Sequence, residues 1–214
     1  MFGIEKKELK ILKKLNTPKK IQDFLNKMPM NFEEDGKDTS LSPMTVLEKG
    51  ICHCVEGATL AALALRLNGY PPLLVDLKAD NKYDFDHVIA VFQQYGKWGA
   101  ISKTNHVVLR YREPVYNSIR ELAMSFFHEY YDRKGRKNLR SYSVPLSLKR
   151  FDKLGWMTTK EEIDYVPETL DEIRHYPIVN QKQIRNFRRA DKIELETDKI
   201  LEWKPKGKAD KSWY

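Results

Sequence analysis

The stretch GICHCVEGATLAALALRLNGYPPLLVDL, residues 50–77, decides the fold of this chain of 214 residues. From Cys54 to Leu67 it is almost wholly apolar, and Asn68-Gly69 then supplies the left-handed ending that is common after helices. A helix that is apolar on every side is buried in the interior of a protein. Small residues would let a sheet approach it closely; these are Gly57, Ala58, Ala61, Ala62 and Ala64. We therefore predict a buried central helix that begins at Cys54.

Four stretches with the composition of strands follow this helix. They are residues 73–77, 87–93, 97–103 and 106–112. Tyr95-Gly96 supplies a turn between the middle two, so we expect them to form an antiparallel hairpin. A helix followed by an antiparallel sheet predicts the α+β fold class.

Upstream and downstream segments are predicted to be mainly helical. Thr17-Pro18 and Ser42-Pro43 each combine a helix-capping side chain with proline at the first helical position. After Pro114 a helical pattern runs from residue 117 to about 131, and the rest is charged and helical in pieces. We expect a core over residues 1–114, a helical extension over 115–203 packed on it, and a disordered tail over 204–214.

The charge balance and the cysteines restrict the class of protein. Lys and Arg number 38 against 30 Asp and Glu, and the net charge of +8 favours anionic partners without selecting one. The first residues are charged where a secretory signal would be apolar, and no run approaches the ~20 apolar residues of a membrane span. We expect a soluble, cytoplasmic protein in which Cys52 and Cys54 remain thiols.

Cys54 is the candidate nucleophile. A cysteine in the first turn of a helix is helped to ionise by the helix dipole and by unpaired backbone N–H groups, and the thiolate is the reactive form. His87 begins a strand after a polar loop, where its ring can point back over the start of the helix and accept the thiol proton. Cys52 is interpreted as a structural, buried residue.

These residues resemble the transglutaminase-like superfamily, whose members are relatives of papain-like thiol enzymes. The family pattern is a cysteine opening a buried helix, then a strand that starts with His, then a paired strand of the form W-x-x-ϕ-D. Cys54, "DHVIAVF" at residues 86–92 and "WGAIS" at 98–102 occupy these places within residues 42–104. The resemblance implies a hydrolase or acyltransferase acting on an amide bond of a peptide, protein or small molecule. Ser102 stands where the family has Asp.

The group that orients the imidazole depends on the hairpin register. An even-numbered loop at Tyr95-Gly96 makes His87 and Ser102 diagonal neighbours on one face, and the serine hydroxyl can then accept a hydrogen bond from the ring. A three-residue loop turns Ser102 away. Asn105 then becomes the candidate, by analogy with the amide of papain-like enzymes. The backbone N–H of Cys54 is the expected oxyanion donor.

Three further residues are candidates for substrate binding: Trp98 on the third strand, Lys103, which could attract an anionic substrate, and His53 at the site entrance. Asp84 and Asp86 flank the histidine and offer a carboxylate in place of the missing Asp. The spacing of the cysteines departs from that of zinc sites, so we predict neither a metal nor another cofactor.

Two other functions are compatible with the sequence. In the first, loss of the Asp marks a non-catalytic member of the same fold that binds a peptide or protein. In the second, a basic loop with Tyr142 binds nucleic acid through phosphate contacts and base stacking. The basic residues are Arg133, Lys134, Arg136, Lys137 and Arg140. The sequence makes no prediction of oligomeric state.

Overall fold

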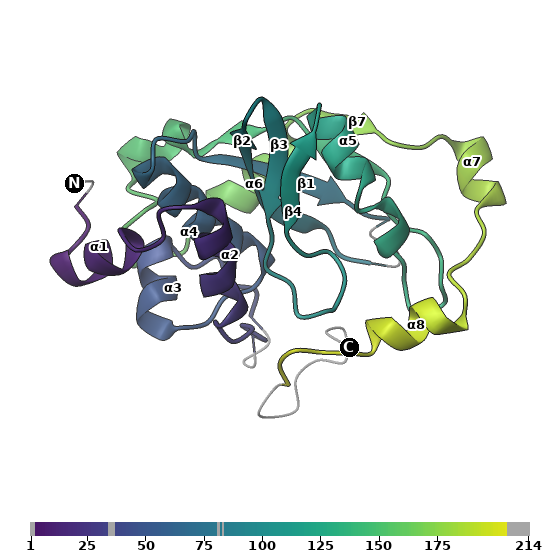
Figure 1. Ribbon diagram of the computed structural model, residues 1–214, viewed down its shortest axis with the longest axis horizontal. Helices are drawn as coiled ribbons and strands as arrows, with labels where there is room; N and C mark the ends of the chain where they lie inside the picture. Colours follow the sequence, from purple (N-terminus) through teal and green to yellow (C-terminus); the bar gives the residue numbers. More distant parts are fainter. Residues whose placement is uncertain (1–2, 34–36, 81, 83, 205–214) are drawn as a thin grey trace.

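The computed structural model describes residues 3–33, 37–80, 82 and 84–204. These residues form one antiparallel sheet of seven strands with helices on both faces (Figure 1). The helices are α1 (Lys6–Leu12), α2 (Pro18–Asn26), α3 (Pro43–Lys49), α4 (Cys54–Leu67), α5 (Ile119–Met124), α6 (Tyr165–Glu172), α7 (Gln181–Asn186) and α8 (Lys192–Asp198), with 3-10 helices η1 (Phe127–Glu129) and η2 (Leu148–Leu154). The strands are β1 (Leu73–Lys78), β2 (His87–Gln94), β3 (Lys97–Ile101), β4 (Arg112–Tyr116), β5 (Ser141–Ser143), β6 (Leu146–Ser147) and β7 (His175–Pro177). The α+β class is confirmed.

The predicted hairpin is present, and of its two possible registers the structure has the one with an even-numbered loop. The strand order is β4-β3-β2-β1-β5-β7, with β6 also paired to β1. Tyr95 and Gly96 have φ values of 53° and 74°, so a two-residue loop joins β2 to β3 and pairs Gln93 with Trp98. Both positive φ angles suit the twist of a tight hairpin. The same register, continued past the end of β3, brings Ser102 opposite Ile89, so that it is a diagonal neighbour of His87 at the start of β2.

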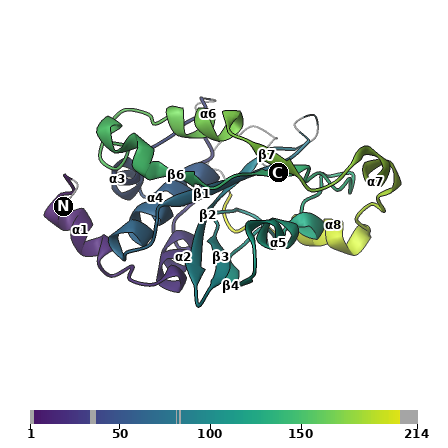
Figure 2. The ribbon, with the colours of Figure 1, turned by 90° about the horizontal axis from the view of Figure 1, so that it is seen from above.

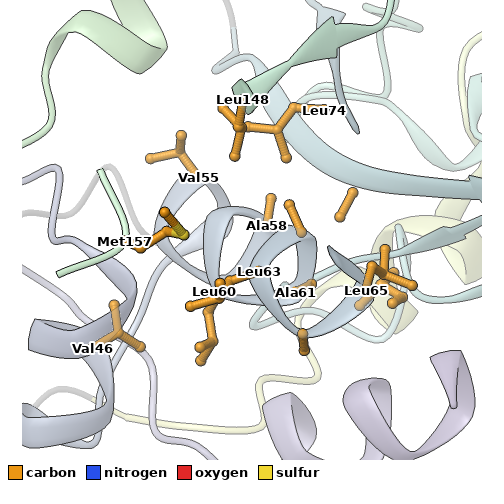
Figure 3. Packing of buried hydrophobic residues seen from close by; sticks show 14 of the residues in the cluster. Val46, Val55, Ala58, Leu60, Ala61, Leu63, Leu65, Leu74, Leu148 and Met157 are labelled. Carbon is orange, nitrogen blue, oxygen red and sulfur yellow. The ribbon is translucent and has the colours of Figure 1, made fainter. Parts of the chain in front are cut away.

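The central helix α4 is also confirmed. Its residues from Val55 to Leu65 are all buried, and it packs on β2. Figure 3 shows its side chains surrounded by residues of other elements, among them Val46, Leu74 and Met157. The helix ends at Asn68, and Gly69 follows with φ 85°. This burial fixes the position of the helix, and therefore that of Cys54 at its first turn.

The sheet separates two hydrophobic clusters. One contains α4 together with Val88, Ala90 and Phe92 of β2, and the helices α1 to α4 lie on that side in Figure 1. The other contains Ile89 and Val91 of β2 with the aromatic side chains that follow α5. Alternate residues of a strand point to opposite faces, so the continuous apolar run of β2 serves both clusters.

The two predicted helix caps are formed as expected. The Thr17 hydroxyl accepts a hydrogen bond from the Lys20 N–H at 3.3 Å, and the Ser42 hydroxyl accepts one from the Thr45 N–H at 3.3 Å. Gly50 closes α3 with φ 69°. Gly50 thus places the short segment 51–53 that leads to Cys54.

The predicted strand over residues 106–112 is wrong. Leu109 has φ 59° and its N–H donates to the Glu129 carboxylate at 2.9 Å, so this segment is an irregular loop. The fourth strand begins only at Arg112, as β4. Pro114 lies within β4, which is an edge strand and therefore tolerates a residue without an N–H.

The C-terminal half carries the predicted helices and also joins the sheet. Strands β5 and β6 pair with β1, and β7 pairs with β5, so the sheet is continuous across the expected boundary at residue 114 (Figure 2). The predicted helix over 117–131 is divided into α5 and η1. Of the predicted tail over 204–214, residues 205–214 lie outside the described part of the chain. No helix in the described ranges combines the length and apolarity of a membrane span.

Candidate active site

Cys54 is the first residue of α4 and is partly exposed, whereas Cys52 is completely buried. The preceding residue, His53, has an extended backbone and begins the helix as its N-cap. The first backbone N–H groups of an α-helix lack partners within the helix, so the sulfur lies in the positive field of this terminus. Position alone thus favours a thiolate at Cys54.

His87 and Ser102 lie together at the same end of the sheet. The Nε2 atom of His87 is 2.8 Å from the Ser102 hydroxyl oxygen, and that hydroxyl donates to the carbonyl oxygen of Leu109. Because the hydroxyl proton is directed to the carbonyl, Ser102 accepts from His87, and Nε2 carries the proton. The Nδ1 atom is then the ring nitrogen left to serve Cys54. This is the arrangement predicted for an even-numbered hairpin loop.

The Cys54 thiol is strongly acidified. Burial raises the pKa of this thiol, but hydrogen bonds from the side chains of His53 and His87, and the charges of both rings, outweigh burial and lower the pKa to about 5. Cys52 contrasts with it: burial raises the pKa of its thiol to about 12, although the charge of Lys103 lowers it. Cys54 is therefore ionised at neutral pH and Cys52 is not.

His53 is more central than the sequence suggested. We expected it at the entrance, but only 6 % of the residue is exposed. Its Nε2 atom lies 2.8 Å from the carbonyl oxygen of Thr39 and 3.4 Å from a carboxylate oxygen of each of Glu33 and Glu56. The sequence feature that could have indicated these contacts is Glu56 in the first turn of α4, where its carboxylate accepts a hydrogen bond from the His53 backbone N–H at 2.9 Å.

Two of the predicted substrate-binding residues, Lys103 and Trp98, lie away from Cys54 and His87 or are buried. Lys103 is 1 % exposed and its ammonium group donates to the carbonyl oxygens of Leu25 and Met28, at the end of α2. It therefore satisfies a helix C-terminus and is not presented to a substrate. Trp98 lies four residues from Ser102 along β3, about 13 Å away at the spacing of a strand, and packs beside the second cluster.

The alternative orienting residue, Asn105, holds the C-terminal segment. Its amide donates to the Trp203 carbonyl oxygen at 3.1 Å and accepts the Trp203 N–H at 2.9 Å. These bonds use both polar atoms of the side chain. Ser102, and not Asn105, is the partner of the His87 ring.

The loop carboxylates before His87 are directed elsewhere. Asp86 accepts the Ala79 N–H at 2.7 Å, and Asp84 accepts the Asn138 amide at 3.2 Å. Burial, together with the charge of Asp76, raises the pKa of Asp86 to about 6. These contacts therefore do not bring a carboxylate to His87.

One acidic cluster has the composition of a cation site. Carboxylate oxygens of Asp76, Asp86 and Asp171 lie within 4.8 Å of one another. The Lys78 ammonium lies 2.9 Å from Asp171 and 3.6 Å from Asp86, and His175 lies 3.0 Å from Asp76. Lysine and histidine side chains of the protein thus already occupy contacts with all three carboxylates.

Most of the basic loop forms ion pairs within the protein. Arg136 pairs with Asp132, Lys137 lies 3.2 Å from Glu194, and Arg140 lies 3.3 Å from Asp80. Phosphate binding depends on cations that are available to the nucleic acid. These pairs reduce the charge that the loop would present to it.

No protein-family model matches the chain, and a search of curated proteins gives no significant match.

Proposed function

We propose that this protein is a thiol hydrolase or acyltransferase that acts on an amide bond through Cys54 and His87. The observation that carries the proposal is the acidified thiol at the first turn of α4, hydrogen-bonded to a histidine whose other nitrogen is held by Ser102. A nucleophile, a base and a group that orients the base are the three parts of a thiol acyl-transfer site.

The chemistry follows from these positions. The Cys54 thiolate attacks the carbonyl carbon, and the backbone N–H of Cys54 faces the oxygen that becomes negative. Protonated His87 then transfers its proton to the leaving nitrogen as the C–N bond breaks. A water or an amine next attacks the thioester, gives its proton to His87, and expels the Cys54 thiolate.

Ser102 holds the His87 ring without adding charge. Its hydroxyl holds the ring through Nε2 and is itself held by the Leu109 carbonyl oxygen, so rotation of the imidazole away from the sulfur would break its hydrogen bond to Ser102. A neutral acceptor does not stabilise an imidazolium as a carboxylate does. Orientation is therefore the role assigned to Ser102.

The experiment is acylation with 4-nitrophenyl acetate, followed by intact mass measurement and by release of nitrophenol. We expect an acetyl group on Cys54 and continued turnover, with both lost in Cys54→Ala and with acylation slowed in His87→Gln. Acylation without turnover would support the binding-domain alternative. Absence of Cys54 acylation at pH 7 would refute the proposed function.

A further inference from the structure

His53 lies between the nucleophile and two carboxylates. Its side chain hydrogen-bonds Cys54, and its Nε2 atom is 3.4 Å from the nearest oxygen of Glu33 and 3.4 Å from that of Glu56. The residue is almost fully buried, so these groups replace water around its ring. The family resemblance assigns no role to a histidine at this position, immediately before the cysteine.

Hydrogen-bond accounting fixes the protonation of this ring. Nε2 lies 2.8 Å from the Thr39 carbonyl oxygen, which can only accept, so Nε2 carries a hydrogen. The ring has one other nitrogen, Nδ1, with which to bond Cys54. A thiolate also only accepts, so Nδ1 carries a hydrogen whenever Cys54 is ionised. A ring with two N–H groups is an imidazolium.

The carboxylate of Glu56 requires such a cation. Glu56 is 1 % exposed and accepts hydrogen bonds from several donors around it: the amide of Asn31, the hydroxyl of Thr39 and the backbone N–H groups of Leu41 and His53. In all of these contacts the Glu56 oxygens are the hydrogen-bond acceptors. A buried charge is costly unless an opposite charge contacts it, and His53 supplies that contact.

We propose that His53 is a permanent imidazolium that keeps Cys54 in the thiolate form, with its charge fixed by Glu33 and Glu56, while His87 alone moves the proton. The inference rests on the proposed role of Cys54 as nucleophile. His53 with Glu33 and Glu56 thus supplies Cys54 with the charged support that the neutral Ser102 hydroxyl cannot give to His87.

The surrounding charges agree with this assignment. Burial lowers the pKa of His53, but hydrogen bonds to Cys54 and Glu33 and the charges of Glu56 and Cys54 outweigh burial and raise the pKa well above its usual value. Cys54 is also hydrogen-bonded to His87 of β2, and Cys52 and Lys103 are buried beside Gly57 in the first turn of α4. The two glutamates are thus the negative groups that act on His53 besides the thiolate.

The proton count of the reaction stays balanced with a static His53. During acylation the C–S bond forms, the C–N bond breaks, and the proton on the leaving nitrogen comes from His87. During deacylation the attacking water gives its proton to His87 and the C–S bond breaks. Cys54 leaves as a thiolate each time, and both N–H bonds of His53 persist.

The first test compares the pH midpoint of Cys54 alkylation by iodoacetamide among full-length variants in a Cys52→Ala background. We expect His53→Gln to raise the midpoint by at least about one pH unit. His87→Gln should leave it below the value of a free thiol while abolishing turnover. The matched control, His175→Gln, removes another histidine–carboxylate pair and should not move it.

Substitution of the glutamates tests the inference through the direction in which the alkylation midpoint of Cys54 moves. Removal of a nearby negative charge should by itself lower the pKa of a thiol. If Glu33 acts through His53, Glu33→Gln instead raises the alkylation midpoint of Cys54, and Glu56→Gln raises it further. Glu33 is the milder substitution because it is less buried than Glu56.

A measurement on the wild-type protein needs no variant to fold. With ¹⁵N-labelled histidine at pH 7, both ring nitrogens of His53 should carry protons, with the exposed His128 as internal reference. A neutral His53 ring would overturn the inference. So would an alkylation midpoint of Cys54 that is unchanged in His53→Gln and rises to the free-thiol value in His87→Gln. That pattern would leave the proposed function intact, because His87 would then activate Cys54, whereas a free-thiol midpoint in the Cys52→Ala protein itself would overturn both the inference and the proposed function.

Discussion

The rate of Cys54 alkylation should be almost independent of pH between pH 6 and 8.5. With a pKa of about 5, the thiol is about 90 % ionised at pH 6 and almost completely ionised at pH 8.5. A free thiol with a pKa of about 8.5 is roughly 0.3 % ionised at pH 6 and about 50 % at pH 8.5. Raising the pH over this range should therefore increase its rate roughly 160-fold. The increase for Cys54 should be about 10 %.

The pH dependence is a better criterion than the absolute rate. A thiolate of lower pKa is a weaker nucleophile. With a Brønsted slope of 0.4–0.5, a pKa lower by about 3.5 reduces the intrinsic rate of the thiolate about 40-fold. Near pH 7 this loss nearly cancels the gain of about 30-fold in thiolate fraction. The partial exposure of Cys54 slows alkylation equally at every pH. Both effects disappear from the ratio of rates at two pH values.

The assay uses the Cys52→Ala variant with a small excess of iodoacetamide and follows the intact mass with time. Glutathione in the same solution serves as the free-thiol reference, and Cys54→Ala measures any modification elsewhere. If the rate at Cys54 rises in parallel with that of glutathione, the thiol is not acidified. The electrostatic reasoning about the start of α4 would then be incorrect.

Three further predictions concern the support of the site and the fold. Ser102→Ala removes the hydrogen-bond acceptor of the His87 ring, worth about 1–1.5 kcal/mol, so acylation by 4-nitrophenyl acetate should slow on the order of tenfold, and an unchanged rate would contradict the proposed orienting role of Ser102. Gly57→Ala would place a Cβ atom 2.6 Å from the Cβ of Lys103. The cost of this overpacking, about 1–3 kcal/mol, should exceed the gain of about 1 kcal/mol in helix propensity, so the free energy of unfolding measured in urea should fall. The hydrogen bond to Asp76 raises the pKa of His175, so this pair stabilises the fold fully below the unfolded value of about 6.5 and loses that contribution as pH rises through the folded pKa. Unfolding of His175→Gln should therefore differ from wild type most at low pH, and a difference that is constant with pH would show that the pair is not the cause.

Local sequence patterns determined the central elements of this protein. The apolar run that begins at Cys54 could be satisfied only by burial on all sides, and Tyr95-Gly96 fixed the register of the hairpin through backbone sterics. Together they placed His87 and Ser102 at one end of the sheet, because a register once set assigns every later pair. Short-range rules therefore predicted the pairing of Cys54 with His87, whereas the choice between Ser102 and Asn105 depended on the loop length that the structure shows.

The remaining roles depend on contacts between residues far apart in the chain. Lys103 is a cation by sequence, but α2 meets it with backbone carbonyl oxygens, so it is buried as a helix C-cap. Glu33 precedes His53 by twenty residues, and no periodicity predicts that the two side chains will meet. Burial of a charge is decided by what surrounds it, and only the tertiary structure brings those surroundings together. The sequence by itself thus determined that Cys54 stands at the start of a buried helix, and the tertiary structure decided which charges act on its thiol.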